Sequence, residues 1–254
     1  MKHSAGEAGG AGPAPEPVRA LFPSDRLPLV QRYADLLATD GVVRGLLGPR
    51  EVPRLWDRHL LNCALLAIPL PRDARLADIG SGAGLPGVVV ALSRPDVRVT
   101  LVEPLLRRTT FLEEVVAGLA LDNVVVRRDR ADALHGKEAF DVVTARAVAP
   151  LERLLGWCMP LVDPDGFLLA MKGDSAEEEI EIARPVLERL GCATPTVEVL
   201  EAPPADGSRA TTTVPPRTRV VRVTWADPAR VSLPTSGDRG GSRTGRRRPS
   251  RRKR

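Results

Sequence analysis

The stretch Leu76-Ala-Asp-Ile-Gly-Ser-Gly-Ala-Gly-Leu-Pro-Gly-Val-Val-Val-Ala-Leu92 decides the fold of this chain. It starts as a short apolar run that predicts a buried strand, breaks into a glycine-rich turn, and continues as an apolar segment of helical length. A strand, a glycine-rich turn and a helix open the nucleotide-binding unit of doubly wound α/β proteins. Glycine suits such a turn because, without a Cβ atom, the backbone reaches positive φ and lies close to a ligand.

Two cofactors compete for this loop. From Gly82 the letters Gly-Ala-Gly-Leu-Pro-Gly87 match the G-x-G-x-x-G fingerprint of dinucleotide sites. From Asp78 the letters Asp-Ile-Gly-Ser-Gly-Ala-Gly84 resemble motif I of S-adenosylmethionine-dependent methyltransferases. A carboxylate repels a pyrophosphate, whereas it favours the sulfonium and ammonium cations of S-adenosylmethionine. Asp78 therefore favours S-adenosyl-L-methionine as the cofactor, with NAD as the alternative.

The rest of the chain alternates strand-like and helical segments, which predicts a parallel sheet covered on both faces. Strands are expected at about 76–79, 98–103, 123–127, 140–145 and 166–171, and helices at about 86–93, 105–118, 149–161 and 175–190. Two more strand-like runs, 196–200 and 217–225, follow without a helix between them. A terminal antiparallel hairpin on five parallel strands is the seven-stranded, Rossmann-like α/β fold of class I methyltransferases.

Composition divides the chain into one folded unit with two tails. We expect a methyltransferase domain over 73–227, an N-terminal helical cap over 21–72, and a disordered Gly/Ala/Pro-rich extension over 1–20. A disordered basic tail is expected over 228–254. From Arg239 to Arg254 it carries nine basic residues and no acid, which leaves 28 basic against 32 acidic residues elsewhere. The tail either binds RNA phosphates in a salt-dependent way or is an extension without function.

Other features narrow the class of protein. The three cysteines and three histidines are scattered, which predicts reduced thiols and no metal site. The N-terminus lacks the apolar core of a signal peptide, and no apolar run reaches the roughly 18 residues of a membrane span. We therefore expect a cytoplasmic protein without membrane attachment. Separately, we expect a monomer.

Candidate ligand-binding residues follow the expected strands, because ligands of such sheets bind at the carboxyl ends of the strands. Glu103 ends the second strand and can accept ribose hydroxyls, or it can cap the next helix. Asp132 and Ala131 follow the third strand, where this fold holds adenine, although a solvated turn explains them nearly as well. Arg146 ends the fourth strand, where it can bind the cofactor, an RNA phosphate or a base edge, or simply lie on the surface.

Catalytic residues stay unassigned at this stage. The chain lacks the Asn/Asp-Pro-Pro-aromatic tetrad of amino-group methylases and the Pro-Cys nucleophile of cytosine-C5 enzymes, and no general base is evident. Methylation of guanine N7 requires none of these groups, because that nitrogen has a free lone pair. Such an enzyme would act by proximity and electrostatics. Lys172 follows the fifth strand, and its role stays open among catalysis, RNA binding and structural support.

Four segments together resemble the ribosomal RNA small subunit methyltransferase G family, also called glucose-inhibited division protein B. They are Asp78-Ile-Gly-Ser-Gly-Ala-Gly-Leu-Pro-Gly87, Trp56-Asp-Arg-His-Leu-Leu-Asn62, Thr144-Ala-Arg-Ala147 and Met171-Lys-Gly173. The similarity spans about residues 25–225. The family's helix segment often has Asp-Ser where this chain has Asn62-Cys63, which leaves the role of that helix open.

This resemblance implies S-adenosylmethionine-dependent methylation of N7 of one guanine near the decoding centre of 16S ribosomal RNA, in the small ribosomal subunit. By position it implies cofactor contacts for Gly80, Leu85, Ala131, Asp132 and Arg146. Three other functions stay open: methylation of a small molecule or protein by the same fold, an NAD-dependent oxidoreductase, and an RNA-binding protein without catalysis.

Overall fold

A seven-stranded sheet forms the centre of the molecule. The computed structural model describes residues 10–202 and 217–231. The strands are β1 Arg75–Ile79, β2 Arg98–Val102, β3 Val124–Arg127, β4 Phe140–Arg146, β5 Val162–Met171, β6 Thr196–Glu201 and β7 Arg217–Val223. Their order is β3-β2-β1-β4-β5-β7-β6, and only β7 runs antiparallel to its neighbours. The predicted five parallel strands with a terminal hairpin are confirmed.

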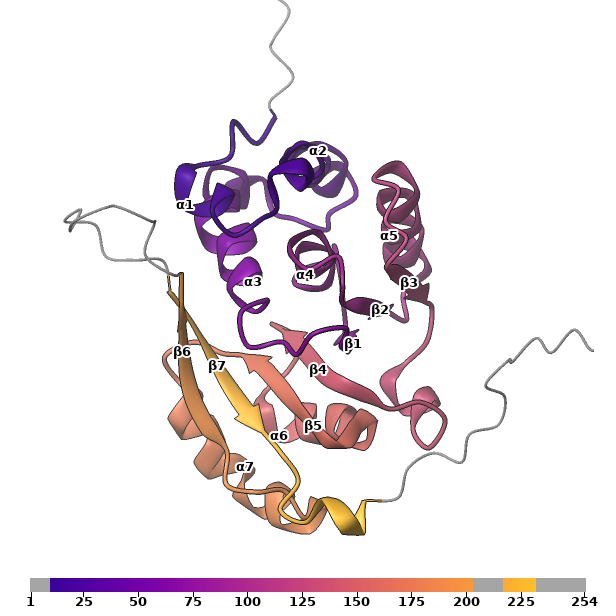
Figure 1. The fold of residues 1–254 in the computed structure, drawn as a ribbon, viewed down its shortest axis with the longest axis vertical. Helices are drawn as coiled ribbons and strands as arrows, with labels where there is room; N and C mark the ends of the chain where they lie inside the picture. The colour runs from indigo at the N-terminus through magenta and orange to yellow at the C-terminus, as the bar shows by residue number, and fades with distance from the viewer. Residues whose placement is uncertain (1–9, 203–216, 232–254) are drawn as a thin grey trace, which may run out of the picture.

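Two layers of helices cover the sheet (Figure 1). One layer holds α4 Gly87–Ser93 and α5 Leu106–Gly118, and the other holds α6 Leu151–Cys158 and α7 Ala176–Leu190. The expected helix over 149–161 is shorter, because a 3-10 turn, Met159–Leu161, follows α6 and β5 begins directly after it. The strand continues through Asp163-Pro-Asp-Gly166 beside an irregularity of β4, where Gly166 passes the carbonyl of Asp141 too closely for a Cβ atom.

The N-terminal helices extend the layer of α4 and α5 (Figure 1). They are α1 Glu16–Arg19, η1 Ser24–Arg26, α2 Leu27–Leu36, η2 Leu37–Gly41, η3 Pro49–Arg54, η4 Leu55–Leu60 and α3 Leu61–Leu65. Their apolar side chains share one core with α4 and α5. Tyr33 is fully buried, and its hydroxyl donates a hydrogen bond to the carbonyl of Ala83 at 2.8 Å. The cap therefore packs directly against the glycine-rich loop.

The prediction that residues 1–20 are disordered is wrong for the second half of that range. Val18, on α1, is fully buried, and the indole N–H of Trp56 donates to the carbonyl of Ala11 at 2.8 Å. These contacts order residues 10–20 despite their simple composition. Val18 buries its apolar side chain, and the buried indole N–H of Trp56 requires an acceptor, which a backbone carbonyl of this segment provides. Residues 1–9 lie outside the described part, as does most of the basic tail expected over 228–254. That region begins with a short 3-10 helix, η7 Pro228–Arg230.

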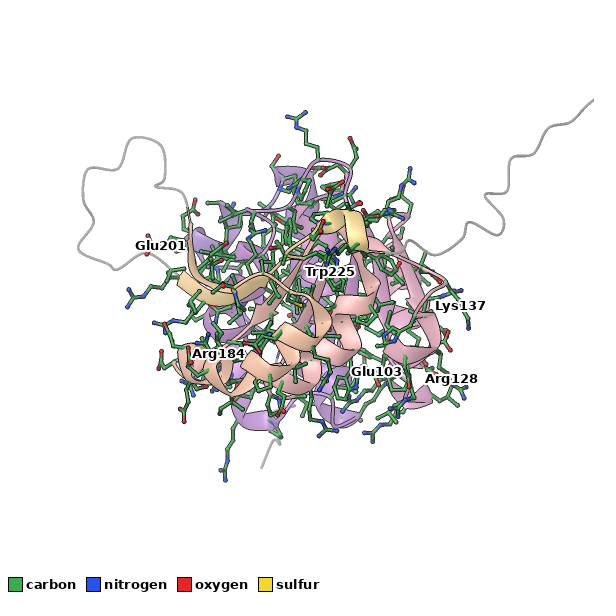
Figure 2. All side chains as sticks on the ribbon, turned by 90° about the horizontal axis from the view of Figure 1, so that it is seen from below. Glu103, Arg128, Lys137, Arg184, Glu201 and Trp225 are labelled. Atoms are coloured by element: carbon green, nitrogen blue, oxygen red, sulfur yellow. The ribbon has the colours of Figure 1, made fainter. Side chains whose placement is uncertain are left out.

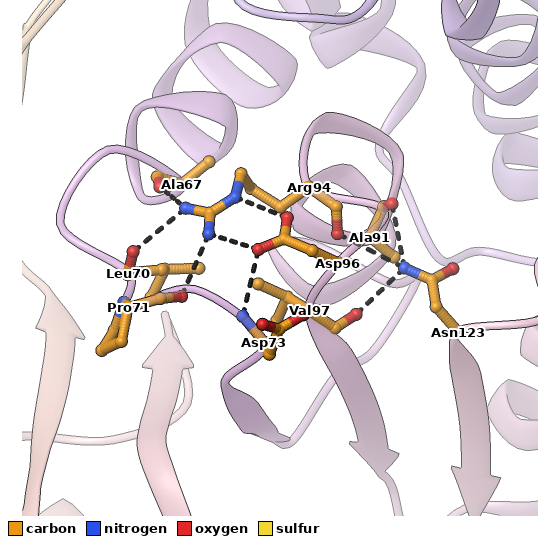
Figure 3. Close-up of polar contacts among 9 residues, drawn as sticks. All are labelled: Ala67, Leu70, Pro71, Asp73, Ala91, Arg94, Asp96, Val97 and Asn123. Carbon is orange, nitrogen blue, oxygen red and sulfur yellow. Dashed lines mark hydrogen bonds and ion pairs between the residues drawn. The ribbon is translucent and has the colours of Figure 1, made fainter.

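A cluster around Arg94 fixes the chain between the cap and β1 (Figure 3). The guanidinium of Arg94 donates to the carbonyls of Ala67, Leu70 and Pro71, each at 3.0 Å. It also pairs with Asp96 at 2.7 Å, which holds the pKa of that carboxyl well below its usual range. Carbonyls at the end of a helix lack partners within it, so Arg94 supplies the donors that the end of the cap requires. Within residues 10–202 and 217–231, no helix combines the length and apolarity needed to cross a membrane.

Candidate functional site

Two adjoining cavities lie at the carboxyl ends of β1, β2 and β4. The larger measures about 590 Å³ and the smaller about 280 Å³. Of the residues predicted from the sequence, Gly80, Leu85, Glu103 and Arg146 line the larger cavity, and Gly80, Ala131 and Asp132 line the smaller one. The structure therefore brings all six together at one edge of the sheet. Their contact with a cofactor stays a prediction.

Val148 divides the two cavities and was not predicted from the sequence. It lines both, together with Gly80 and Pro104. Gly80 has φ +73°, and a Cβ atom there would lie 2.8 Å from a methyl group of Val148. The valine thus rests on the bare backbone of the glycine. Only a residue without a side chain permits this contact, which explains one glycine of the loop.

Two carboxylates occupy N–H donors of the glycine-rich loop. The N–H of Gly82 donates to Glu103 at 3.1 Å, and the N–H of Gly87, the first residue of α4, donates to Asp78 at 2.9 Å. A dinucleotide pyrophosphate would need such donors free and a positive potential around them. The loop of this chain is instead surrounded by its own acids, which disfavours a dinucleotide.

Asp78 stabilises the glycine-rich loop through a hydrogen bond with the first residue of α4. Its side chain is fully buried and is not among the residues lining either cavity. The reason is that its carboxylate turns toward the start of α4, where Gly87 leaves space for it. Burial raises the pKa of Asp78 to about 7, against the lowering effect of the Gly87 N–H. Oδ1 of Asp78 has no hydrogen-bond partner among the described residues.

Glu103 connects β2, the loop and α5. Its side chain is only 1% exposed. Oε1 accepts from the N–H of Leu105 at 3.1 Å, and Oε2 accepts from Gly82 and, at 3.3 Å, from Arg108. Leu105 is the residue before the first turn of α5, so this contact fixes the approach of the chain to the helix and does not cap the free N–H groups of the helix itself. A carboxylate accepts about four hydrogen bonds, so Glu103 retains capacity for a ribose hydroxyl.

The smaller cavity lies between the turn η5 Ala131–Leu134 and helix α6. Asp132 is exposed and pairs with Arg130 at 3.3 Å. From α6, Arg153 and Trp157 line the same cavity, with the guanidinium 5.3 Å from the centre of the ring. Sequence reasoning missed these two, although their spacing of four residues places them on one helix face. Close in sequence to this turn, Arg128 and Lys137 are exposed and point outward (Figure 2).

Arg146 reaches the cap from the end of β4. Its guanidinium lies 2.5 Å from Nδ1 of His59 and 3.2 Å from Sγ of Cys63. His59 also lines the larger cavity. Burial raises the pKa of the Cys63 thiol to about 11, so the thiol stays protonated. The helix segment with the departure at Asn62-Cys63 is therefore part of the wall of the site.

The contacts of Lys172 indicate a structural role. Its ammonium donates to the carbonyl of Ala149 at 2.9 Å and to Glu179 at 2.6 Å, and its side chain is 8% exposed. Glu179 also accepts from the N–H of Leu151 at 2.7 Å. Lys172 thus ties α7 to the loop that follows β4, and it is not among the residues lining the two cavities.

Comparison with known proteins assigns the family. The model of the rRNA small subunit methyltransferase G family matches residues 26–205. The chain belongs to this family. A methyltransferase G of Nocardioides sp. is 64% identical over 225 residues, covering 89% of this chain and 86% of the relative. The Thermobifida fusca relative is 60% identical over 67% of this chain and 72% of its own length. The Streptomyces avermitilis relative is 56% identical over 75% and 80%.

Solved structures support the fold alone. A structure from Pyrococcus horikoshii, described as a transferase, aligns with a TM-score of 0.51 at 13% identity. The alignment covers 65% of this chain and 63% of the other. Membership of the methyltransferase G family sets aside the oxidoreductase alternative, in agreement with the acids around the glycine-rich loop.

Proposed function

We propose that this chain uses S-adenosylmethionine to methylate N7 of one guanine of 16S ribosomal RNA, near the decoding centre of the small ribosomal subunit. The observation that carries the proposal is membership of the methyltransferase G family over residues 26–205. The geometry agrees with it, because the site lies where class I methyltransferases bind their cofactor, at the carboxyl ends of the parallel strands.

The two cavities fit the methyl donor. Their sizes lie in or near the range of small-molecule sites. Glu103 would accept a ribose hydroxyl, and Asp132 with the backbone of Ala131 would hold the adenine amine and ring in the smaller cavity. Arg146 would hold the cofactor carboxylate, or a group of the target nucleotide, in the larger one. Each assignment matches the charge of the protein group to the chemistry of its partner.

The described residues point to catalysis by positioning. When bound, S-adenosylmethionine supplies a methyl group whose bond to sulfur breaks as the N7 lone pair bonds to the carbon, with the electron pair passing to sulfur. N7 carries no proton, so no base is required. His59 is the imidazole in the wall of the larger cavity, and both of its nitrogens already have partners, Arg146 and Glu51. The protein therefore contributes orientation and electrostatics.

The ribosomal substrate implies a cytoplasmic location, and we expect the enzyme to act as a monomer. The basic tail, with nine cations between Arg239 and Arg254, would add salt-dependent affinity for ribosomal RNA.

The test is a tritiated methyl-transfer assay on 30S particles from a strain that lacks the gene, with N7-methylguanine mapped in RNase fragments. Wild type is compared with Gly82→Asp, which places a carboxylate next to Glu103 in the loop. Gly191→Asp is the matched control, because Gly191 also has a left-handed φ, +73° against +59°, but lies at the end of α7 with nothing within 4 Å. Aspartate is among the residues that tolerate a left-handed φ, which both positions require.

The expected result is label at a single guanine with wild type and Gly191→Asp, and loss of label with Gly82→Asp. Binding of S-adenosylmethionine without label in RNA would overturn the RNA substrate and keep the cofactor. Label that survives RNase treatment of a ribosomal extract would move the substrate to a protein or small molecule.

A further inference from the structure

A chain of polar contacts runs from the cap to Arg146. Glu51, on η3, lies 2.7 Å from Nε2 of His59, on η4. Nδ1 of the same imidazole lies 2.5 Å from Nη2 of Arg146, on β4. The imidazole side chain is 11% exposed and the Glu51 side chain 30%. Cys63, on α3, contacts the second terminal nitrogen of Arg146 at 3.2 Å. Two elements of the cap, η4 and α3, therefore contact one guanidinium, and a third, η3, reaches it through His59.

The donors and acceptors of this chain permit one proton arrangement. A guanidinium has donors only, so Nδ1 of His59 has to accept. A carboxylate accepts only, so Nε2 has to carry the proton that faces Glu51. The neutral imidazole with its proton on Nε2 satisfies both partners. Burial and the charge of Arg146 lower the pKa of His59 and favour this neutral form, while Glu51 opposes them.

We propose that Glu51 and His59 are positioning residues that hold the Arg146 guanidinium in the wall of the larger cavity. The inference rests on the proposed function, in which Arg146 binds the cofactor or the target nucleotide. Arginine has a long side chain with many rotamers, so an unheld guanidinium would lose conformational entropy when a ligand binds. Two of its five N–H donors are engaged by His59 and Cys63, which leaves three for a ligand. The cap thus orders the cation before binding.

The same geometry makes ligand affinity sensitive to acid. Protonation of His59 turns Nδ1 into a donor that faces the donors of Arg146 and places two cations in contact. The charged groups around the imidazole are Arg146 from β4, Glu51 from η3 and Arg58 from its own helix, which lies 3.6 Å from Glu51. The folded pKa of His59 lies below the ordinary value of about 6.5. Affinity should therefore hold at neutral pH and fall as the pH drops through that lowered pKa.

Two substitutions separate the two nitrogens of His59. In His59→Asn the amide oxygen reaches the place of Nδ1 and accepts from Arg146, but it does not titrate. In His59→Gln the longer amide reaches the place of Nε2 and contacts Glu51, but it withdraws the acceptor from Arg146. Asp57→Asn is the control, because Asp57 is an exposed acid on the same helix.

The measurement is the dissociation constant of S-adenosylmethionine by calorimetry from pH 5 to pH 8, with melting curves to verify folding. His59→Gln should weaken binding about tenfold at pH 7.5, the equivalent of one charged hydrogen bond. His59→Asn should weaken it less than about threefold and lack the decline at acid pH that wild type shows. Asp57→Asn should match wild type.

Equal weakening in His59→Asn and His59→Gln at pH 7.5 would overturn the positioning role. If either His59 variant fails to fold, Glu51→Leu serves instead, because Glu51 is partly exposed. That variant should weaken binding about threefold, because without the Glu51 carboxylate the imidazole proton is no longer held on Nε2 and Nδ1 is less often free to accept from Arg146. Unchanged affinity would overturn the proposal. Wild type that does not bind S-adenosylmethionine would overturn the proposed function itself, a result distinct from all of these.

Discussion

Asp78 gives the sharpest prediction for stability. Its carboxyl is fully buried with a pKa of about 7, against 3.8 for an ordinary aspartate. Between these values the folded state binds more protons than the unfolded state, so the free energy of unfolding falls as the pH rises. One pKa unit corresponds to about 1.4 kcal/mol, which gives a loss of about 4 kcal/mol above pH 7. More than half of that loss, about 3 kcal/mol, falls between pH 5 and pH 8.

Asp78→Asn removes the titration and keeps an oxygen that can accept from the N–H of Gly87. The difference in unfolding free energy between variant and wild type should therefore shift in favour of the variant by about 3 kcal/mol from pH 5 to pH 8. Urea unfolding at four pH values measures it, with coincident fluorescence and circular dichroism curves as the check of two-state behaviour. Asp57→Asn is the control for removal of an exposed carboxyl. A difference that stays constant across this range would refute the reasoning.

Three further predictions test other parts of the structure. Glu103→Gln should weaken S-adenosylmethionine binding by about tenfold in calorimetry, because a buried charged acceptor becomes a neutral one; affinity equal to wild type would remove Glu103 from the site. Lys172→Met should lower the free energy of unfolding by about 3 kcal/mol, since it leaves the Glu179 carboxylate without its ammonium, while the cofactor affinity changes less than about twofold. Adding Glu179→Leu should restore most of that stability, and a purely additive loss would contradict the pairing. Deletion of 239–254 should reduce the salt dependence of binding to 30S particles, and identical salt slopes would reject a role for the tail.

The order of the elements could be predicted from the sequence because each element carries its own local signal. The apolar run before Gly80, the glycines and the alternation that follows determine a doubly wound sheet, and the absence of a helix between the last two strand-like runs predicts the terminal hairpin. Glu103, Asp132 and Arg146 could be chosen because parallel strands end at one edge, so that residues after different strands come together.

Contacts between distant segments could be decided only by the tertiary structure. The direction of the Asp78 side chain depends on the space left by Gly87, and the environment of Lys172 depends on Glu179 of α7. The contact of Arg146 with His59 joins residues 87 positions apart in the chain. No local pattern encodes such a pairing, because it results from how the cap packs on the sheet. The sequence by itself determined the fold and the edge at which the site lies, while packing decided which side chains face the cavities and which hold them in place.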